Sequence, residues 1–192
     1  MLYKEVSAAI AIFITFYAFI PYILSILSGK TRAHVFSWII WGLTTLIVFF
    51  AQIEAKGGIG AIPIGISAGI TLFIALLAYT KKNDSDITKT DWWFFILALA
   101  SVPLWYFTSE PIWAVAILTL VDLAGFGPTL RKAYQFPHSE SPLFFGLFFI
   151  RNLSVILALE SYSLTTVLFP AAIALACIML ISIIMIRRRQ LS

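Results

Sequence analysis

The sequence predicts an all-α integral membrane protein whose seven transmembrane helices form two parallel three-helix repeats joined by a linker helix. Of its 192 residues, 61% are hydrophobic and only 11% are charged, whereas a soluble domain has about 25% charged residues. Apolar runs of membrane-spanning length recur along the chain. A constant spacing also relates prolines and basic residues in its two halves.

Seven apolar segments are separated by short stretches of charged and turn-forming residues. A transmembrane helix needs about 20 apolar residues. The segments near this length are 6–27, 35–53, 58–80, 92–108, 111–130, 142–160 and 162–186. The first is too long for the core of a cleavable signal peptide, so we expect it to be a helix of the bundle. The fifth should break near Gly125, Gly127 and Pro128.

The Lys and Arg residues between the segments predict the orientation. If the segments cross in alternation, the side that holds the N-terminus has only Lys4 and Lys56. The other side has Lys30, Arg32, Lys81, Lys82, Lys89, Arg131, Lys132, Arg187, Arg188 and Arg189. The positive-inside rule then predicts an external N-terminus and a cytoplasmic C-terminus, in a bacterial inner membrane or plasma membrane.

An offset of 107 residues relates the first and last segments, as the residue numbers show. It separates Pro21 from Pro128, Pro63 from Pro170, and the basic pair Lys81-Lys82 from Arg188-Arg189. Matches among aliphatic residues are expected by chance, but two prolines and a basic pair in one register indicate an internal repeat.

The repeat divides the chain into three parts. Residues 1–80 form a first triplet, residues 81–110 a cytoplasmic loop and linker helix, and residues 111–192 a second triplet. A single linker helix leaves both triplets in the same orientation, related by an axis along the membrane normal.

This plan resembles the SWEET and PQ-loop transporter superfamily. Its members have three plus one plus three helices, an external N-terminus and a proline late in the first helix of each triplet. Their pattern continues with Lys-Ser or Lys-Thr in the next loop and a serine at the start of helix two. Pro21, Lys30-Thr31 and Ser37 stand at these places in the first triplet, and Pro128 in the second. Nicotinamide riboside transporters, which are tryptophan-rich and share the plan, are a second resemblance. Both imply transport of a small solute.

Asp122 and Arg151 are charged residues inside apolar segments, and Asn152 follows directly. At about 1.5 Å per residue they lie about 12 Å and 13 Å from the cytoplasmic ends of their segments, near the middle of the membrane. Intramembrane charges are costly and mark binding sites, pathways or helix pairs. One interpretation is a structural ion pair between segments five and six. The other is that Arg151 binds an anionic group, or that Asp122 accepts a proton or a substrate amine.

Polar residues at the same estimated depth extend these charges into a layer across the bundle. At offset 107, Thr15, Thr44 and Thr45 are the repeat equivalents of Asp122, Arg151 and Asn152. Other segments contribute Thr71, Ser101 and Cys177. The substrate-binding set predicted from this layer is Asp122, Arg151, Asn152, Thr15, Thr45, Thr71 and Ser101.

Prolines and aromatic residues are candidates for moving parts. Pro21 and Pro128 each free a backbone carbonyl one turn earlier, so each permits a passive kink or a hinge. Trp38 and Trp41 correspond to Phe145 and Phe148 at offset 107. Such residues form an interfacial aromatic belt, or here a stacking wall or gate below the polar layer.

We therefore predict a transporter of a small polar solute, sugar-like, amino-acid-like or vitamin-like, that works by alternating access around a midplane site. The alternative is a receptor-like protein that binds in the same cavity without transport. No catalytic set, cofactor motif or metal-ligand spacing is recognisable, so we expect neither an enzyme nor a metal protein. The expected partners are the lipid bilayer and the solute. The net charge of +4 comes from loop residues and does not indicate nucleic acid. A homo-oligomer is compatible with the sequence.

Overall fold

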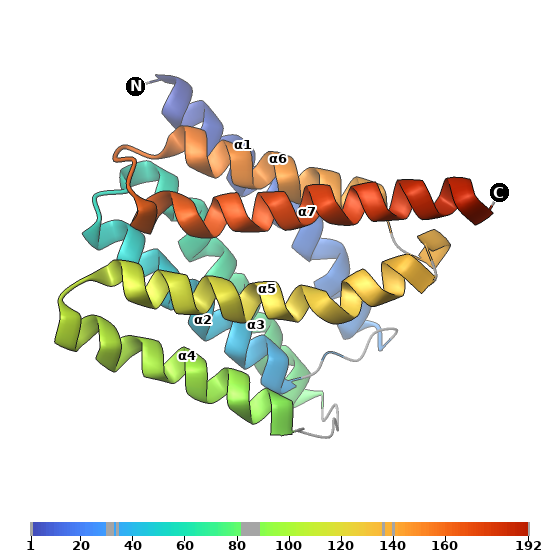
Figure 1. Cartoon of the computed structure of the whole chain (residues 1–192), viewed down its shortest axis with the longest axis horizontal. Coiled ribbons are helices and arrows are strands. Elements are labelled where there is room, and N and C mark those ends of the chain that lie inside the picture. The colour runs from blue at the N-terminus through green and yellow to red at the C-terminus, as the bar shows by residue number, and fades with distance from the viewer. Residues whose placement is uncertain are drawn as a thin grey trace.

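The computed structural model describes residues 2–29, 33, 35–81, 89–135, 137–139 and 141–191. These ranges contain seven α-helices, two 3₁₀ helices and no strand (Figure 1), so the prediction of an all-α protein is confirmed. The helices are α1 (Leu2–Leu27), α2 (Val35–Glu54), η1 (Gly58–Ala61), α3 (Ile62–Thr80), α4 (Lys89–Thr108), α5 (Pro111–Gln135), η2 (Pro137–Ser139), α6 (Pro142–Ala158) and α7 (Leu164–Leu191).

Several of these helices are suited to a bilayer. Within the described residues, four helical segments are long and apolar enough to cross a membrane by length and composition: Leu2–Leu27, Val35–Glu54, Gly58–Thr80 and Leu164–Leu191. Shorter apolar helical stretches cover Phe95–Thr108, Pro111–Ala124 and Pro142–Ala158. Large apolar side chains on the outside, such as Phe13, Leu120 and Leu175, are 69%, 66% and 67% exposed. An exterior of this kind is stable in lipid rather than in water.

The predicted break near Gly125, Gly127 and Pro128 is wrong. Helix α5 continues through these residues to Gln135, and its C-terminal part turns relative to its first part (Figure 1). Proline bends a helix when neighbouring groups can compensate for the lost hydrogen bond, and packed transmembrane bundles offer such groups. Helix α1 likewise continues through Pro21.

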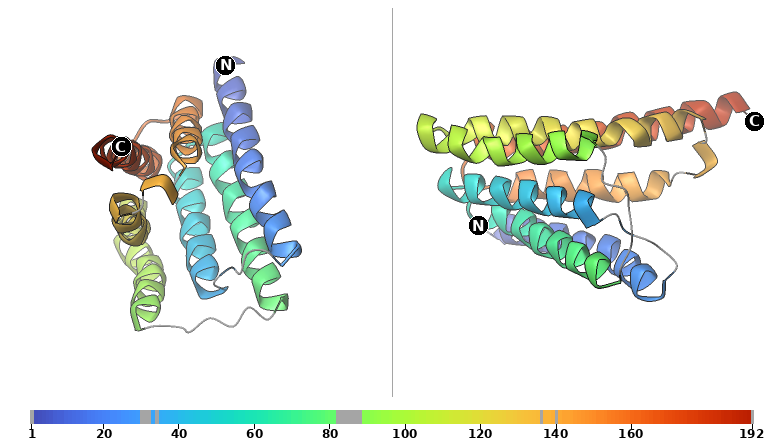
Figure 2. Two further views of the ribbon diagram at one scale, coloured as in Figure 1. Left: turned by 90° about the vertical axis from the view of Figure 1, so that its right-hand side faces the viewer. Right: turned by 90° about the horizontal axis from the view of Figure 1, so that it is seen from below.

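We call α1–α3 the first triplet and α5–α7 the second, after the grouping predicted from the sequence. In the first triplet α3 packs against both α1 and α2, and in the second α7 packs against both α5 and α6 (Figure 2). The triplets meet through α1 with α6 and through α2 with α5. Helix α4 packs against α5 and α2 at the side of the bundle.

The two chain ends lie at opposite ends of the bundle (Figure 1). The α2–α3 and α6–α7 connections lie at the end that holds the N-terminus, here called the N-terminal end. Helix α6 begins at the other end, where the Ser141 side chain accepts a hydrogen bond from the Phe144 amide at 3.4 Å and Pro142 occupies the first turn.

Candidate functional site

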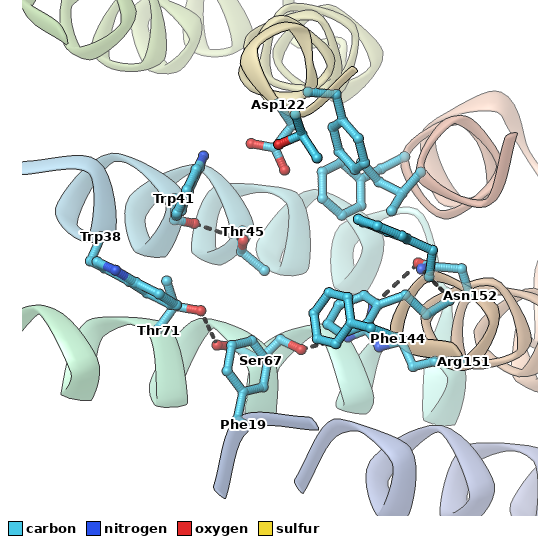
Figure 3. A pocket seen from close by; sticks show the side chains of 16 residues that line it. Phe19, Trp38, Trp41, Thr45, Ser67, Thr71, Asp122, Phe144, Arg151 and Asn152 are labelled. Carbon is cyan, nitrogen blue, oxygen red and sulfur yellow. Dashed lines mark hydrogen bonds between the residues drawn. The ribbon is translucent and has the colours of Figure 1, made fainter. Parts of the chain in front are cut away.

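A cavity of about 310 Å³ lies between the two triplets (Figure 3). Its described lining side chains come from α1, α2, α3, α5, α6 and α7. This size is at the lower end of the range for small-molecule sites, which is about 300–1,000 Å³. The lining residues are Phe19, Trp38, Trp41, Thr45, Ser67, Thr71, Asp122, Phe126, Thr129, Phe144, Phe145, Phe148, Arg151, Asn152, Phe169 and Ile173.

Arg151 is buried and almost fully hydrogen-bonded by the protein itself. It is 5% exposed. Its Nε donates to the Thr15 hydroxyl at 3.3 Å and its Nη1 to Asn152 Oδ1 at 3.2 Å. Its Nη2 donates to the Pro63 carbonyl at 3.1 Å and to the Ser67 hydroxyl at 2.6 Å. These bonds use four of the five guanidinium N–H groups, so Arg151 ties α6 to α1 and α3.

The Asp122 carboxylate has far fewer hydrogen-bond partners than the Arg151 guanidinium. Its Oδ1 accepts a hydrogen bond from the Thr44 hydroxyl at 3.3 Å. The same hydroxyl lies 3.0 Å from the Trp41 carbonyl, and a hydroxyl has only one proton to donate. No cation lies within ion-pair distance of Asp122 in the part of the chain that the structure describes. The side chain is only partly buried and points into the cavity (Figure 3).

A direct ion pair between Asp122 and Arg151, one of the two predicted interpretations, is therefore not formed. Both residues line the same cavity, but they approach it from different helices and from different sides (Figure 3). Helical spacing placed both near the same depth, but the direction of each side chain also depends on the rotation of its helix. Thr15, Pro63 and Ser67 surround the guanidinium instead.

The two charges occupy related positions in the repeat register. At offset 107, Thr15 corresponds to Asp122 and Thr44 to Arg151. The hydrogen bond from Arg151 to Thr15 joins α6 to α1, and that from Thr44 to Asp122 joins α2 to α5. If the two triplets are exchanged at this offset, the positions of Arg151 and Thr15 become those of Thr44 and Asp122. Each charge thus meets a threonine across the triplet interface.

The remaining predicted binding residues differ in how they relate to the cavity. Thr45, Thr71 and Asn152 line the cavity. Thr15 contacts it only through Arg151. Ser101 is fully buried in α4, donates to the Ala98 carbonyl at 2.6 Å and does not belong to the lining. Its estimated depth was compatible with the polar layer, but no described side chain of α4 lines the cavity.

Aromatic side chains form half of the cavity lining. Ring contacts run from Phe144 to Phe148, then to Phe19, Trp38 and Trp41, with centroid distances of 4.8, 6.3, 6.3 and 5.4 Å. The contact between Phe19 and Phe148 crosses from one triplet to the other. Trp38, Trp41 and Phe145 thus lie in the cavity wall. Pro21 is not among the lining residues, and the side chain of Pro128 lies outside the described residues.

The triplets are joined directly at the N-terminal end. The Glu160 amide donates to the Gly57 carbonyl at 3.0 Å, and the Ile59 amide donates to Glu160 Oε1 at 3.4 Å. Gly60 packs so closely on the α6–α7 connection that a Cβ atom there would lie 2.6 Å from the Leu159 nitrogen. We call residues 57–60 with 159–160 the loop–loop contact.

Nearby, Gln52 Nε2 of α2 donates to the Thr166 carbonyl of α7 at 2.8 Å. Together these bonds close the N-terminal end of the interface between the triplets.

Ser67 is the main polar residue of the site that the sequence analysis missed. It stands one turn before the predicted Thr71, on the same face of α3, because residues four apart share a helix face. That spacing was the available signal.

The Lys30-Thr31 part of the family resemblance lies outside the described residues. Comparisons of this chain with family models, curated proteins and solved structures find no match.

Proposed function

We propose that this chain is a membrane transporter that moves a small polar solute by alternating access around the cavity between its two triplets. The observation that best supports this proposal is the position of the cavity. It lies between two helix triplets that are joined at the N-terminal end, and it holds a weakly supported carboxylate, Asp122. Transporter sites built from repeats lie at the interface of the repeats, near the middle of the membrane.

The arrangement of the helices supports a repeat-based mechanism. The equivalent neighbour relations of the triplets and the two threonine–charge contacts at offset 107 are expected of parallel repeats. In the proposed topology seven helices cross the bilayer in the three plus one plus three order of SWEET and PQ-loop transporters. The N-terminus is then outside and the C-terminus cytoplasmic.

Access would alternate by movement of one triplet against the other. The cavity lining includes Trp38 and Trp41 in the first turns of α2, and Phe144 and Phe145 in the first turn of α6. Both helices begin at the end opposite the loop–loop contact. We assign this conformation to a state that faces the cytoplasm. The external opening would then require separation of the loop–loop contact.

Uptake into proteoliposomes tests this proposal. Purified protein is reconstituted, and the entry of labelled sugars, amino acids and vitamins is compared with entry into protein-free vesicles. Saturable, protein-dependent uptake of at least one class is expected. Stabilisation of the protein by a solute of the panel without any uptake would instead indicate the receptor-like alternative. We expect no chemical change in the solute, because we propose transport and not catalysis.

A further inference from the structure

We propose that the solute recognised in the cavity is a small organic ammonium ion with an apolar or aromatic body. This inference rests on the proposed function, because it assigns the substrate class of the same site. Three observations carry it: the different partners of the two charges, the hydrogen bonds of the Thr45 and Thr71 hydroxyls, and the aromatic wall.

Asp122 is the charge that is available to a ligand. Arg151 is 5% exposed and directs four N–H groups to the protein. Asp122 is more accessible and shares a single described donor, the Thr44 hydroxyl, with the Trp41 carbonyl. A carboxylate in an apolar cavity needs a compensating positive charge or hydrogen-bond donors. An ammonium group supplies both.

Two of the four hydroxyl groups that line the cavity, those of Thr45 and Thr71, also favour a donor ligand. The Thr45 hydroxyl donates to the Trp41 carbonyl at 2.7 Å, and the Thr71 hydroxyl donates to the Ser67 carbonyl at 2.7 Å. Each proton is therefore used inside its own helix, and the oxygen lone pairs remain. With Asp122, these side chains present mainly acceptors. An ammonium group has donors and no acceptor, whereas a carboxylate ligand would require donors.

The aromatic wall suits the rest of such a ligand. Eight of the sixteen lining residues are Phe or Trp. Aromatic faces attract cations and also bury apolar groups. Trp38 and Trp41 belong to α2, the helix that also supplies Thr44 to Asp122. A compact ammonium ion with an aromatic body would therefore find a carboxylate and aromatic surfaces in one cavity.

Three probes of similar size and the same ring separate the possible classes. Benzylammonium, benzyl alcohol and benzoate carry a positive charge, no charge and a negative charge, respectively. Binding to the full-length protein in detergent is measured at neutral pH by thermal shift and by calorimetric titration. Benzylammonium should bind saturably and at least about tenfold more tightly than the other two probes.

Asp122→Asn is the deciding variant, because it keeps the shape of the side chain and removes its charge. It should weaken benzylammonium binding about tenfold or more. Thr119→Val, which changes a buried residue of α5 outside the cavity lining without changing charge, is the matched control and should retain most of the binding. Equal binding of benzylammonium by the wild type and Asp122→Asn would overturn the inference. Preference for benzoate, or no binding of any probe, would also overturn it.

The transport proposal can fail separately. Binding of benzylammonium that depends on Asp122, without uptake into proteoliposomes, would support the ammonium site and contradict transport. Saturable uptake of a neutral or anionic solute that is unchanged in Asp122→Asn would support transport and contradict the ammonium site.

Discussion

Arg151 connects three helices through one buried side chain. Its partners are a hydroxyl of α1, and a carbonyl and a hydroxyl of α3, with Asn152 beside it on α6. A buried cation is tolerated when hydrogen bonds replace its hydration, and removing it leaves the partner groups unsatisfied. At the scale of single residues, the two charges therefore differ in their contacts. Arg151 stabilises the bundle, and Asp122 faces the cavity.

Replacing Arg151 should lower the stability of the protein. Arg151→Gln cannot reach all four acceptors, so we expect a loss of about 2–3 kcal/mol, measured by thermal or denaturant unfolding in detergent. Asp122→Asn is the control and should unfold near the wild-type temperature or above it, because it removes a weakly supported charge. A large loss of stability in Asp122→Asn, with none in Arg151→Gln, would reverse these assignments.

The double variant tests whether the charges are coupled. For a direct ion pair, replacing both partners would restore much of the stability lost by replacing one. The two residues share no hydrogen bond in the structure, so their effects should add to within about 0.5 kcal/mol. Recovery of stability in Asp122→Asn with Arg151→Gln, relative to Arg151→Gln alone, would indicate a pair that forms in another conformation.

Sequence reasoning located the site better than it described its contacts. Counting along helices identified Asp122, Arg151, Asn152, Thr45 and Thr71, all of which line the cavity. Counting gives depth and spacing, but contacts depend on how each helix is rotated and on which neighbour it packs against. For that reason the fourfold support of Arg151 and the position of Ser101 outside the cavity were not predictable.

At the scale of elements, the two triplets contact each other through the α2–α3 and α6–α7 connections, which form the loop–loop contact. Gly58 has a backbone φ of +60°, a conformation that suits glycine. Gly60 has no side chain and so allows the backbone at Leu159 to approach. The helix bounds could be predicted closely, apart from extensions of four or five residues at the start of α1 and at the ends of α5 and α7. The loop–loop contact could not, because its glycines show no periodic pattern and contact a connection distant in the sequence.

Gly60→Ala should weaken the loop–loop contact. Its Cβ would meet the Leu159 backbone at 2.6 Å, and such overpacking costs about 1–3 kcal/mol. A cysteine placed at Ile173, in a Cys177→Ser background, should then react faster with an impermeant methanethiosulfonate added outside. Gly69→Ala is the matched control, since a Cβ there meets nothing within 4 Å. Equal labelling of the Gly60→Ala and Gly69→Ala proteins would show that this contact does not limit external access.

At the scale of the whole molecule, orientation depends on the distribution of basic residues. The two chain ends lie at opposite ends of the bundle (Figure 1), which agrees with the odd number of crossings that we propose. The cluster Arg187 to Arg189 follows the apolar part of α7. There, Arg187 donates to the Tyr134 carbonyl at 3.0 Å and stacks over the Tyr134 ring at 4.2 Å. This end is the one predicted to be cytoplasmic.

Reporter fusions test this orientation. A reporter that works only in the cytoplasm should be active when it is joined after Ser192. A reporter that works only outside the cytoplasm should be active when it is inserted at Lys56, because loops rich in Lys and Arg remain inside. The reverse pattern would invert the orientation. The same location for both reporters would contradict an odd number of crossings between residues 56 and 192.

The contacts of Arg151 with Thr15 and of Thr44 with Asp122 have a genetic consequence under the proposed repeat. In an assembly of two identical triplets, each codon is expressed twice, so a new aspartate or arginine would appear on both sides of the interface. A duplicated and fused gene can mutate one copy while the other keeps its threonine. A chain of this kind can place one negative and one positive residue around a single cavity, which no symmetric pair of separate subunits can do at these positions.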